Sequence, residues 1–422
     1  MQLVAYGAQD IYLTGNPQIT FFKVVYRRHT NFAMEAIEQV FTGNVALGKK
    51  TSCTIARNGD LVGKMYLEVD LAYDHNDANT SPAGACEDLI CSVPGHAMIN
   101  YVEVEIGGQA IDKHYGEWLN IWMQLTETVE GAEKHLRLID GSLQAGKPRA
   151  PCSNTDCNLR KVYVPLQFWF NRNPGLALPL IALQYHEVKL NVMFNKASYV
   201  VATTGDKVKI ENVCLFCDYI FLDTDERRRF AQVSHEYLIE QVQFNGRNNM
   251  SGNIQNIELR FNHPCKEIVW VGHDKSQREN RPFNFSGVDG VDLVKKAVLQ
   301  LNGHDRFRER EGTYFRVTQQ YQHHTGSVNI LAACNANTIN NVITPNKNNG
   351  IYLYSFAINP EEHQPSGTCN FSRIDNAVLT LETVAECDTS AVLVNCDEIR
   401  VYATNYNVLR IMSGMGGLAY SN

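Results

Sequence analysis

The sequence predicts an all-β chain that contains two consecutive β-sandwiches. Three observations support this prediction: most periodic segments alternate with a period of two, helical periodicity is rare, and short motifs of the first half recur in the second. The chain has 422 residues, of which 44% are hydrophobic and 20% are charged. This length allows two domains with a core each, and the composition is too apolar for a disordered chain.

The predicted strands show the alternation of half-buried antiparallel strands. In residues 64–71 the apolar side chains share one face and the more polar ones the other, and residues 101–106, 188–194 and 257–261 follow the same pattern. Turn residues such as Asn58-Gly59 and Asn302-Gly303 separate these runs. About eight strands per half with long connections predict two tandem eight-stranded jelly-roll β-sandwiches, a double jelly roll with a few short helices in loops.

Two segments are predicted to be helical. Residues 115–129 carry apolar side chains at helical spacing, and we expect this helix to lie across a sheet end with Trp118 and Trp122 as packing anchors. Residues 223–231 begin with Asp223 and Thr224, either of which can cap a helix, and continue with acidic residues that suit the positive end of a helix. We expect this second helix to connect the two halves.

Internal repetition is the most informative feature of the chain. The tetrapeptide 37–40 (IEQV) recurs as 239–242, the strand and turn at 104–109 resemble 299–304, and residues 170–174 resemble 356–360. The order of the motifs is kept, which favours a duplicated domain. We expect a first jelly roll at 23–222, a connector helix at 223–235 and a second jelly roll at 236–422, after an N-terminal segment at 1–22.

Charge and cysteine content narrow the class of protein. The formal net charge of −7 argues against non-specific nucleic-acid binding, and no specific nucleic-acid binding is expected. Residues 1–10 do not resemble a secretory signal, and no apolar run is long enough to span a membrane. We therefore expect a soluble chain whose 12 cysteines are mostly free thiols. Cys152/Cys157 and Cys387/Cys396 are the pairs most compatible with disulfides.

Two motifs come close to binding sites without satisfying their chemistry. Residues 43–51 (GNVALGKKT) resemble a phosphate-binding loop, but Lys50 stands where Ser or Thr is needed, and a strand is predicted to follow. We expect a hairpin turn with exposed lysines. Cys214 and Cys217 have the spacing of a zinc or redox pair, but residues three apart on a predicted strand point to opposite faces.

No constellation indicates catalysis, and no cofactor or metal is expected. None of the 13 histidines forms the His-x-His pair of a cupin metal site, and His323-His324 are expected in a polar loop. The carboxylate pairs Asp225/Glu226 and Glu361/Glu362 are expected on solvated faces. The basic clusters at 26–29, 227–229 and 306–310 favour ion pairs between subunits over nucleic-acid contacts. Sequons that could accept glycans occur at Asn79, Asn249, Asn284 and Asn370.

Long stretches of the chain resemble the major capsid proteins of large icosahedral double-stranded DNA viruses, especially those of algal and giant viruses. The resemblance rests on residues 7–23 (GAQDIYLTGNPQITFFK), 174–186 (PGLALPLIALQYH), 218–230, 365–376 (PSGTCNFSRIDN) and 405–420 (NYNVLRIMSGMGGLAY). These motifs span the chain and follow the order of the family.

The resemblance implies a structural protein of the virion capsid, made and assembled in the host cytoplasm, and not an enzyme. It implies a homotrimer of two jelly rolls per chain, hence a pseudo-hexagonal capsomer that tiles an icosahedral shell. It places residues 1–22 on the inner face, near minor capsid proteins and an internal viral membrane. The alternatives are a minor or paralogous capsid protein, and a double-jelly-roll protein that binds carbohydrate or processes glycans. A glycosidase would need paired carboxyls at a concave site.

Overall fold

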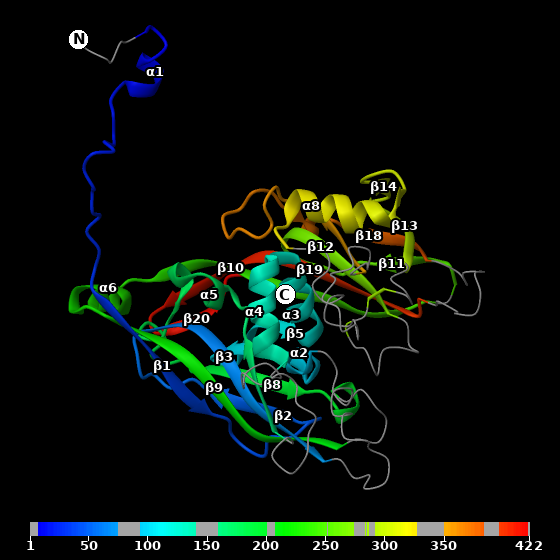
Figure 1. Ribbon diagram of the computed structural model, residues 1–422, viewed down its shortest axis with the longest axis horizontal. Helices are drawn as coiled ribbons and strands as arrows, with labels where there is room; N and C mark the ends of the chain where they lie inside the picture. Colours follow the sequence, from blue (N-terminus) through cyan, green and yellow to red (C-terminus); the bar gives the residue numbers. More distant parts are fainter. Residues whose placement is uncertain are drawn as a thin grey trace.

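The computed structural model describes residues 7–74, 93–140, 159–200, 207–250, 252–273, 283, 285–286, 292–326, 350–383 and 396–420. These residues form four antiparallel sheets, which pair into two sandwiches (Figure 1). The prediction of a double jelly roll is confirmed. Among the described residues, no helix is long and apolar enough to cross a membrane.

The first sandwich uses strands from the first half of the chain. One sheet has the order β1 (Phe32–Val40), β9 (Lys207–Leu222), β3 (Leu61–Asp74) and β6 (Leu159–Pro165), with the short β7 (Leu178–Pro179) beside β3. The other sheet has the order β2 (Lys50–Thr54), β8 (Val188–Phe194), β4 (Ile99–Ile106) and β5 (Gln109–Tyr115).

The second sandwich uses strands from the second half. One sheet has the order β10 (His235–Asn249), β19 (Glu398–Met412), β12 (Pro264–His273) and β16 (Ile351–Ser355), with β17 (Cys369–Asn370) beside β12 and β20 (Met415–Leu418) beside β19. The other has the order β11 (Ile254–Glu258), β18 (Ala377–Thr383), β13 (Val294–Leu301) and β14 (His304–Asp305), with β15 (Arg310–Glu311) beside β13.

The two sandwiches follow the same strand order, so each strand of the first has a counterpart in the second. The repeated tetrapeptides lie in β1 and β10, which occupy the same position at the end of their sheets. The repeated turns join β4 to β5 and β13 to β14, and both use two residues with positive φ: Gly107 and Gly108 in one, Asn302 and Gly303 in the other. Such left-handed pairs fit two-residue hairpin turns, which explains the Gly and Asn found there.

Short helices connect and cover the sheets. They are α1 (Ile11–Thr14), α2 (Pro94–Ala97), α3 (Gly116–Thr126), α4 (Val129–Asp140), α5 (Trp169–Arg172), α6 (Thr224–Gln232) and α8 (Gln319–His323), with single turns or π-helical turns at Pro174–Leu176, Ala197–Tyr199, Tyr314–Thr318 and Phe371–Arg373. The predicted connector helix is present as α6. Its N-cap is Asp223, whose carboxylate accepts a hydrogen bond from Thr224 N at 2.8 Å.

The predicted helix at 115–129 was too long. Helix α3 ends at Thr126 because Glu127 is extended, and Thr128 then begins α4 by accepting a hydrogen bond from Gly131 N at 3.3 Å. Val129 therefore starts a second helix and is 55% exposed instead of packing with the tryptophans. The prediction continued across the break because apolar residues recur at helical spacing on both sides of it. This spacing gives no sign that Glu127 is extended.

Helix α3 joins the two sandwiches. Its side chains Trp118 and Trp122 lie in one apolar cluster with Val269, Leu353 and Tyr402 of the second sandwich. The Trp118 ring centroid is 5.9 Å from that of Trp122 and 5.5 Å from that of Tyr402. The tryptophans are anchors, as predicted, but they hold the second sandwich against the first rather than only closing the end of a sheet.

The C-terminal hairpin β19–β20 also returns to the first sandwich. Tyr185 N donates to Gly414 O at 2.9 Å, and the His186 ring lies 2.9 Å from Gly416 O. A Cβ on Gly416 would lie 2.7 Å from a Leu183 methyl, so only glycine fits this contact without movement. The C-terminal hairpin thus adds a second set of contacts between the two halves of the chain.

We predict that Trp118→Ala lowers the free energy of unfolding by about 3–5 kcal/mol, because it removes a large ring from a packed junction. Chemical denaturation of the purified chain measures this change. Leu138→Ala on α4 is the control, since Leu138 is 42% exposed and should change stability by no more than about 0.5 kcal/mol. A similar small loss for Trp118→Ala would show that the ring does not hold the sandwiches together.

Candidate assembly site

Three of the buried carboxylates at or beside the junction, Glu240, Glu117 and Glu267, each lie against basic groups. Glu240 on β10 is 5% exposed, and its oxygens lie 2.7 Å from Arg172 Nη2, 3.0 Å from Lys266 Nζ and 3.3 Å from His363 Nδ1. Burial alone would raise the pKa of Glu240, but Arg172, His363 and Lys266 outweigh it and lower that pKa to about 2. Arg172 comes from α5, so this ion pair crosses between the two sandwiches.

Lys266 is the most deeply buried cation of this group. Its side chain is 1% exposed, and Nζ donates to Pro360 O at 2.7 Å besides pairing with Glu240. Burial lowers the pKa of Lys266. A buried ammonium is stable only when its N–H groups have acceptors. The folded state therefore needs Glu240 and the Pro360 carbonyl as acceptors for Lys266.

A second carboxylate, Glu117 on α3, reaches the second sandwich. It pairs with Arg400 of β19, and its Oε1 lies 3.0 Å from His273 Nε2. Burial would raise the pKa of Glu117, but Arg400 and His273 lower it to about 2. The helix that carries the tryptophan anchors therefore also carries a charge whose partners belong to the other half of the chain.

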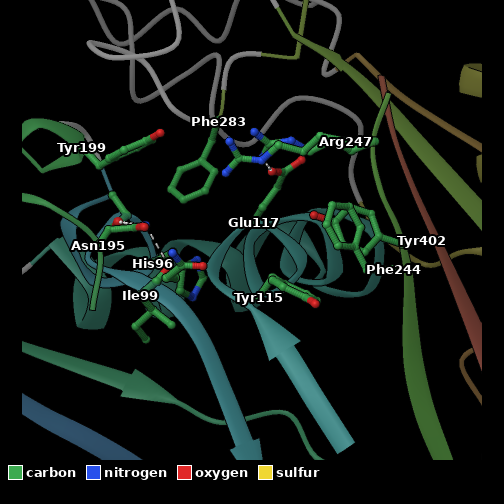
Figure 2. Close-up of a pocket in the computed structure, with 13 residues that line it drawn as sticks. His96, Ile99, Tyr115, Glu117, Asn195, Tyr199, Phe244, Arg247, Phe283 and Tyr402 are labelled. Carbon is green, nitrogen blue, oxygen red and sulfur yellow. Dashed lines mark hydrogen bonds and ion pairs between the residues drawn. The ribbon is translucent and has the colours of Figure 1, made fainter. Parts of the chain in front are cut away.

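A cavity of about 200 Å³ opens beside Glu117. Figure 2 shows Glu117 and Arg247 next to each other, with Tyr402 and Phe244 on one side and His96, Asn195 and Tyr199 on the other. Glu117 is the single carboxylate among the described residues that line this cavity. The cavity thus offers one ion-paired carboxylate rather than the pair that glycoside hydrolysis requires.

The third carboxylate, Glu267, forms a chain with a histidine. His324 Nε2 lies 2.8 Å from Glu267 Oε2, and its Nδ1 lies 3.0 Å from Glu361 Oε1. Burial alone would lower the pKa of His324, but Glu267 and Glu361 outweigh burial and raise this pKa to about 9. The ring is therefore charged at neutral pH and joins β12, α8 and the segment after β16.

Two predictions for this region were wrong. His323-His324 do not lie in a polar loop, because His323 ends helix α8 and His324 is buried. Glu361 was expected on a solvated face, but it accepts hydrogen bonds from the His324 ring and from Thr325 N at 2.9 Å. Sequence spacing could not reveal this cluster, since its three members come from separate segments that only the fold brings together.

An apolar arm at the N-terminus is the clearest unpartnered surface. Residues 11–36 are all exposed, and the arm extends away from the sandwiches (Figure 1). Its large apolar side chains include Tyr12 at 92%, Phe21 at 90% and Phe22 at 98% exposure. The hydrogen bonds of residues 7–22 run within the arm itself. So many exposed aromatic side chains indicate a surface that is covered in an assembly.

The arm leads directly into β1, an edge strand. Because β1 ends the order of its sheet, one row of its backbone groups has no partner strand among the described residues. Phe32, Met34 and Val40 on this strand are 56%, 55% and 74% exposed. Apolar edge strands readily pair or pack with other chains. We define the assembly surface as the arm, residues 7–31, together with β1.

Two of the four sequon asparagines, Asn249 and Asn370, lie among the described residues. Asn249 ends β10 and is exposed, and Asn370 is exposed in β17, where its side chain accepts from Ser372 N at 3.1 Å. Its neighbour Phe371 is buried. Asn79 and Asn284 lie outside the described residues, so glycosylation at the four sequons stays a prediction.

The two near-miss motifs adopt the predicted strands. After residues 43–49, β2 begins at Lys50 where a phosphate-binding loop would begin a helix. Cys214 and Cys217 both lie in β9. Cys53, Cys214, Cys217, Cys265 and Cys369 are free thiols. Cys152, Cys157 and Cys387 lie outside the described residues. No group of metal-ligating side chains occurs in the part of the chain that the structure describes.

We predict that the His324 cluster makes stability depend on pH. Because the folded pKa of about 9 exceeds the ordinary value of 6.5, the stabilisation is complete below pH 6.5 and is lost as pH rises through 9. The loss is ~3 kcal/mol, from ~1.4 kcal/mol per pKa unit. Melting temperature should fall from pH 6.5 to pH 9.5, and His324→Gln should flatten this fall.

His29→Gln is the matched control, because His29 is exposed on the arm. It should keep the full pH dependence of the unchanged chain. An unchanged slope in His324→Gln would show that the buried histidine is not charged in the folded protein.

Comparison with known proteins agrees with this geometry. Residues 20–223 match the family model described as "Major capsid protein N-terminus", and residues 226–417 match "Large eukaryotic DNA virus major capsid protein". The chain is 51% identical over 427 residues to a major capsid protein of Pyramimonas orientalis virus, covering 100% of this chain and 99% of the relative. It is 41% identical over 478 residues to that of Paramecium bursaria Chlorella virus 1, with the same coverage.

Solved structures are similar as well. The PBCV-1 capsid protein VP54 aligns with a TM-score of 0.77 and 36% identity over 96% of this chain and 100% of that one. The Faustovirus major capsid protein, at 14% identity, aligns with a TM-score of 0.69 over 96% and 94%, which supports the fold. The chain belongs to the family of large eukaryotic DNA virus major capsid proteins, and it is a structural component of the virion capsid.

Proposed function

We propose that the chain forms a homotrimeric, pseudo-hexagonal capsomer that tiles an icosahedral shell, and that it acts without catalysis. The observation that carries this proposal is the repeated strand order of two sandwiches fixed side by side within one chain. Three copies bring six sandwiches of one topology around an axis, and a closed ring of this kind satisfies the same contacts in every copy.

The proposal includes a division of labour along the chain. The first jelly roll, expected at 23–222, begins with β1 at Phe32, because residues 23–31 belong to the arm. Residues 236–422 form the second jelly roll, residues 223–235 connect the two, and residues 1–22 lie on the inner face of the shell. The exposed aromatic side chains of the arm support the last point, because they require a covering surface. We propose that minor capsid proteins, close to an internal viral membrane, supply this surface, and that synthesis and assembly take place in the host cytoplasm.

We predict that native mass spectrometry of the purified chain at micromolar concentration gives a trimer. Interfaces of a stable oligomer bury at least about 1,000 Å² per contact, and the exposed edge strand β1 would contribute to such an interface. A stable monomer over the micromolar range would contradict the capsomer.

We predict that deletion of residues 1–22 leaves the melting temperature and the trimer unchanged but impairs shell assembly. The reason is that the hydrogen bonds of residues 7–22 stay within the arm. The double variant Phe21→Ser/Phe22→Ser should reproduce the defect. Electron microscopy of co-expressed capsid components measures the yield of closed shells.

Tyr321→Ser/Ile358→Ser is the control, because these side chains are 87% and 70% exposed but belong to the second sandwich. It tests whether any loss of exposed apolar area has the same effect. Unfolding of the chain on deletion of residues 1–22 would show that the arm belongs to a core, and normal shells would show that it is not needed for assembly.

A further inference from the structure

Two cysteines of the second sandwich lie directly opposite each other on neighbouring strands. Cys265 on β12 is the register partner of Cys369 on β17, in an antiparallel pair. Side chains of register partners point to the same face of the sheet, with Cα atoms about 4.5–5.5 Å apart. This spacing lies within the range of about 4.4–6.8 Å that disulfides span.

Both thiols contact the same core, but they differ in access. Cys265 has no exposed surface and belongs to the second apolar core, and its Sγ lies 3.6 Å from the carbonyl oxygens of Asn262 and His263. Cys369 is half-buried and packs against that core from its edge. Burial raises the pKa of both thiols, and Arg306 opposes this rise only at Cys369. Cys369 is therefore the thiol that a soluble oxidant reaches first.

We propose that Cys265 and Cys369 are a redox-responsive pair, open in a reducing medium and closed to a cross-strand disulfide by a small disulfide oxidant. The Cys369 thiolate attacks one sulfur of the oxidant, and the other half leaves as a thiolate. The Cys265 thiolate then attacks Cys369 Sγ and releases the second half. Two protein thiols are oxidised, one oxidant disulfide is reduced to two thiols, and the two protons pass to the leaving thiolates.

The closed bond would fasten the segment that returns from β16 to β17. This segment, residues 356–368, already contacts β12, because Phe356 N donates to Lys266 O at 2.8 Å. It also carries Glu361 of the His324 cluster and the Pro360 carbonyl that accepts from Lys266. A disulfide at its end closes a loop of about 100 residues, a length for which the loss of unfolded-chain entropy is large.

The bond should also be readily reduced. Opposite residues in a ladder keep their Cβ atoms about 4.5–5.5 Å apart, whereas a relaxed disulfide brings them to about 3.5–4.5 Å. The strands must therefore approach locally, and this strain favours the open form in reducing conditions.

Cys214, on strand β9, provides a control. Cys214 lies opposite Val40 on β1 and Glu68 on β3, so no cysteine faces it along the sheet. Its exposed fraction is small, and burial raises its pKa to about 11. Cys214→Ala should leave the Cys265–Cys369 link intact.

The test equilibrates the full purified chain with mixtures of oxidised and reduced glutathione, alkylates the remaining thiols, and maps linked peptides by mass spectrometry. We expect one peptide pair joining Cys265 to Cys369, reversal by excess reduced glutathione, and a melting temperature several degrees higher in the oxidised form. Cys369→Ser should abolish both the link and the rise, and Cys214→Ala should keep both.

The result that would overturn the proposal is alkylation of both cysteines at every glutathione ratio. A lasting glutathione adduct on Cys369 without the link would also overturn it, because Cys265 would then fail to resolve the intermediate. Should Cys369→Ser fold poorly, the same linked peptide and its reversal in the unchanged chain still decide the question.

Discussion

The contact between helix α3 and the second sandwich is the constraint on which the rest of the molecule depends. The helix belongs to the first half of the chain, yet it places Trp118 and Trp122 in an apolar cluster with strands of the second half. It also places Glu117 beside Arg400 and His273. A buried carboxylate without these partners would cost several kcal/mol, so the two sandwiches must dock in one orientation to satisfy it.

This constraint explains how a duplicated chain became a single building block. Glu38 and Glu240 occupy the same position in the repeated tetrapeptide, but Glu38 is exposed on β1 whereas Glu240 is buried on β10 against Arg172. The first copy thus leaves its edge strand exposed, while the second copy uses the equivalent strand to bind the first sandwich. In the proposed capsomer, this one strand position would serve contacts with other chains in the first copy and docking within the chain in the second.

The sequence was informative wherever local pattern determines structure. Alternation in residues 64–71 and 101–106 identified β3 and β4, and Asp223 identified the start of α6, because these features depend on neighbours in sequence. The break between α3 and α4 escaped periodicity, since the apolar spacing runs across Glu127. His324 and Glu361 escaped it as well, because their partner Glu267 lies on a strand far away in the chain.

The arm and the buried ion pairs also depend on contacts that the local sequence does not reveal. In the sequence, residues 7–23 stand out only by their resemblance to the family. The structure adds that their apolar side chains are exposed, because neither sandwich covers them. The ion pair of Glu240 with Arg172 left no signal in the sequence, because a glutamate on a strand normally faces solvent. What the fold adds is the docking of the two halves, which buries the apolar cluster around Trp118 and brings Arg172 to Glu240.

The junction fixes the two sandwiches as one unit, and we propose that three such units assemble around one axis. Cryo-electron microscopy of the purified chain tests it most directly. The account predicts particles with six similar lobes around a threefold axis, each pair of lobes joined in the orientation set by α3. Isolated two-lobed particles, or lobes at variable angles to each other, would contradict it.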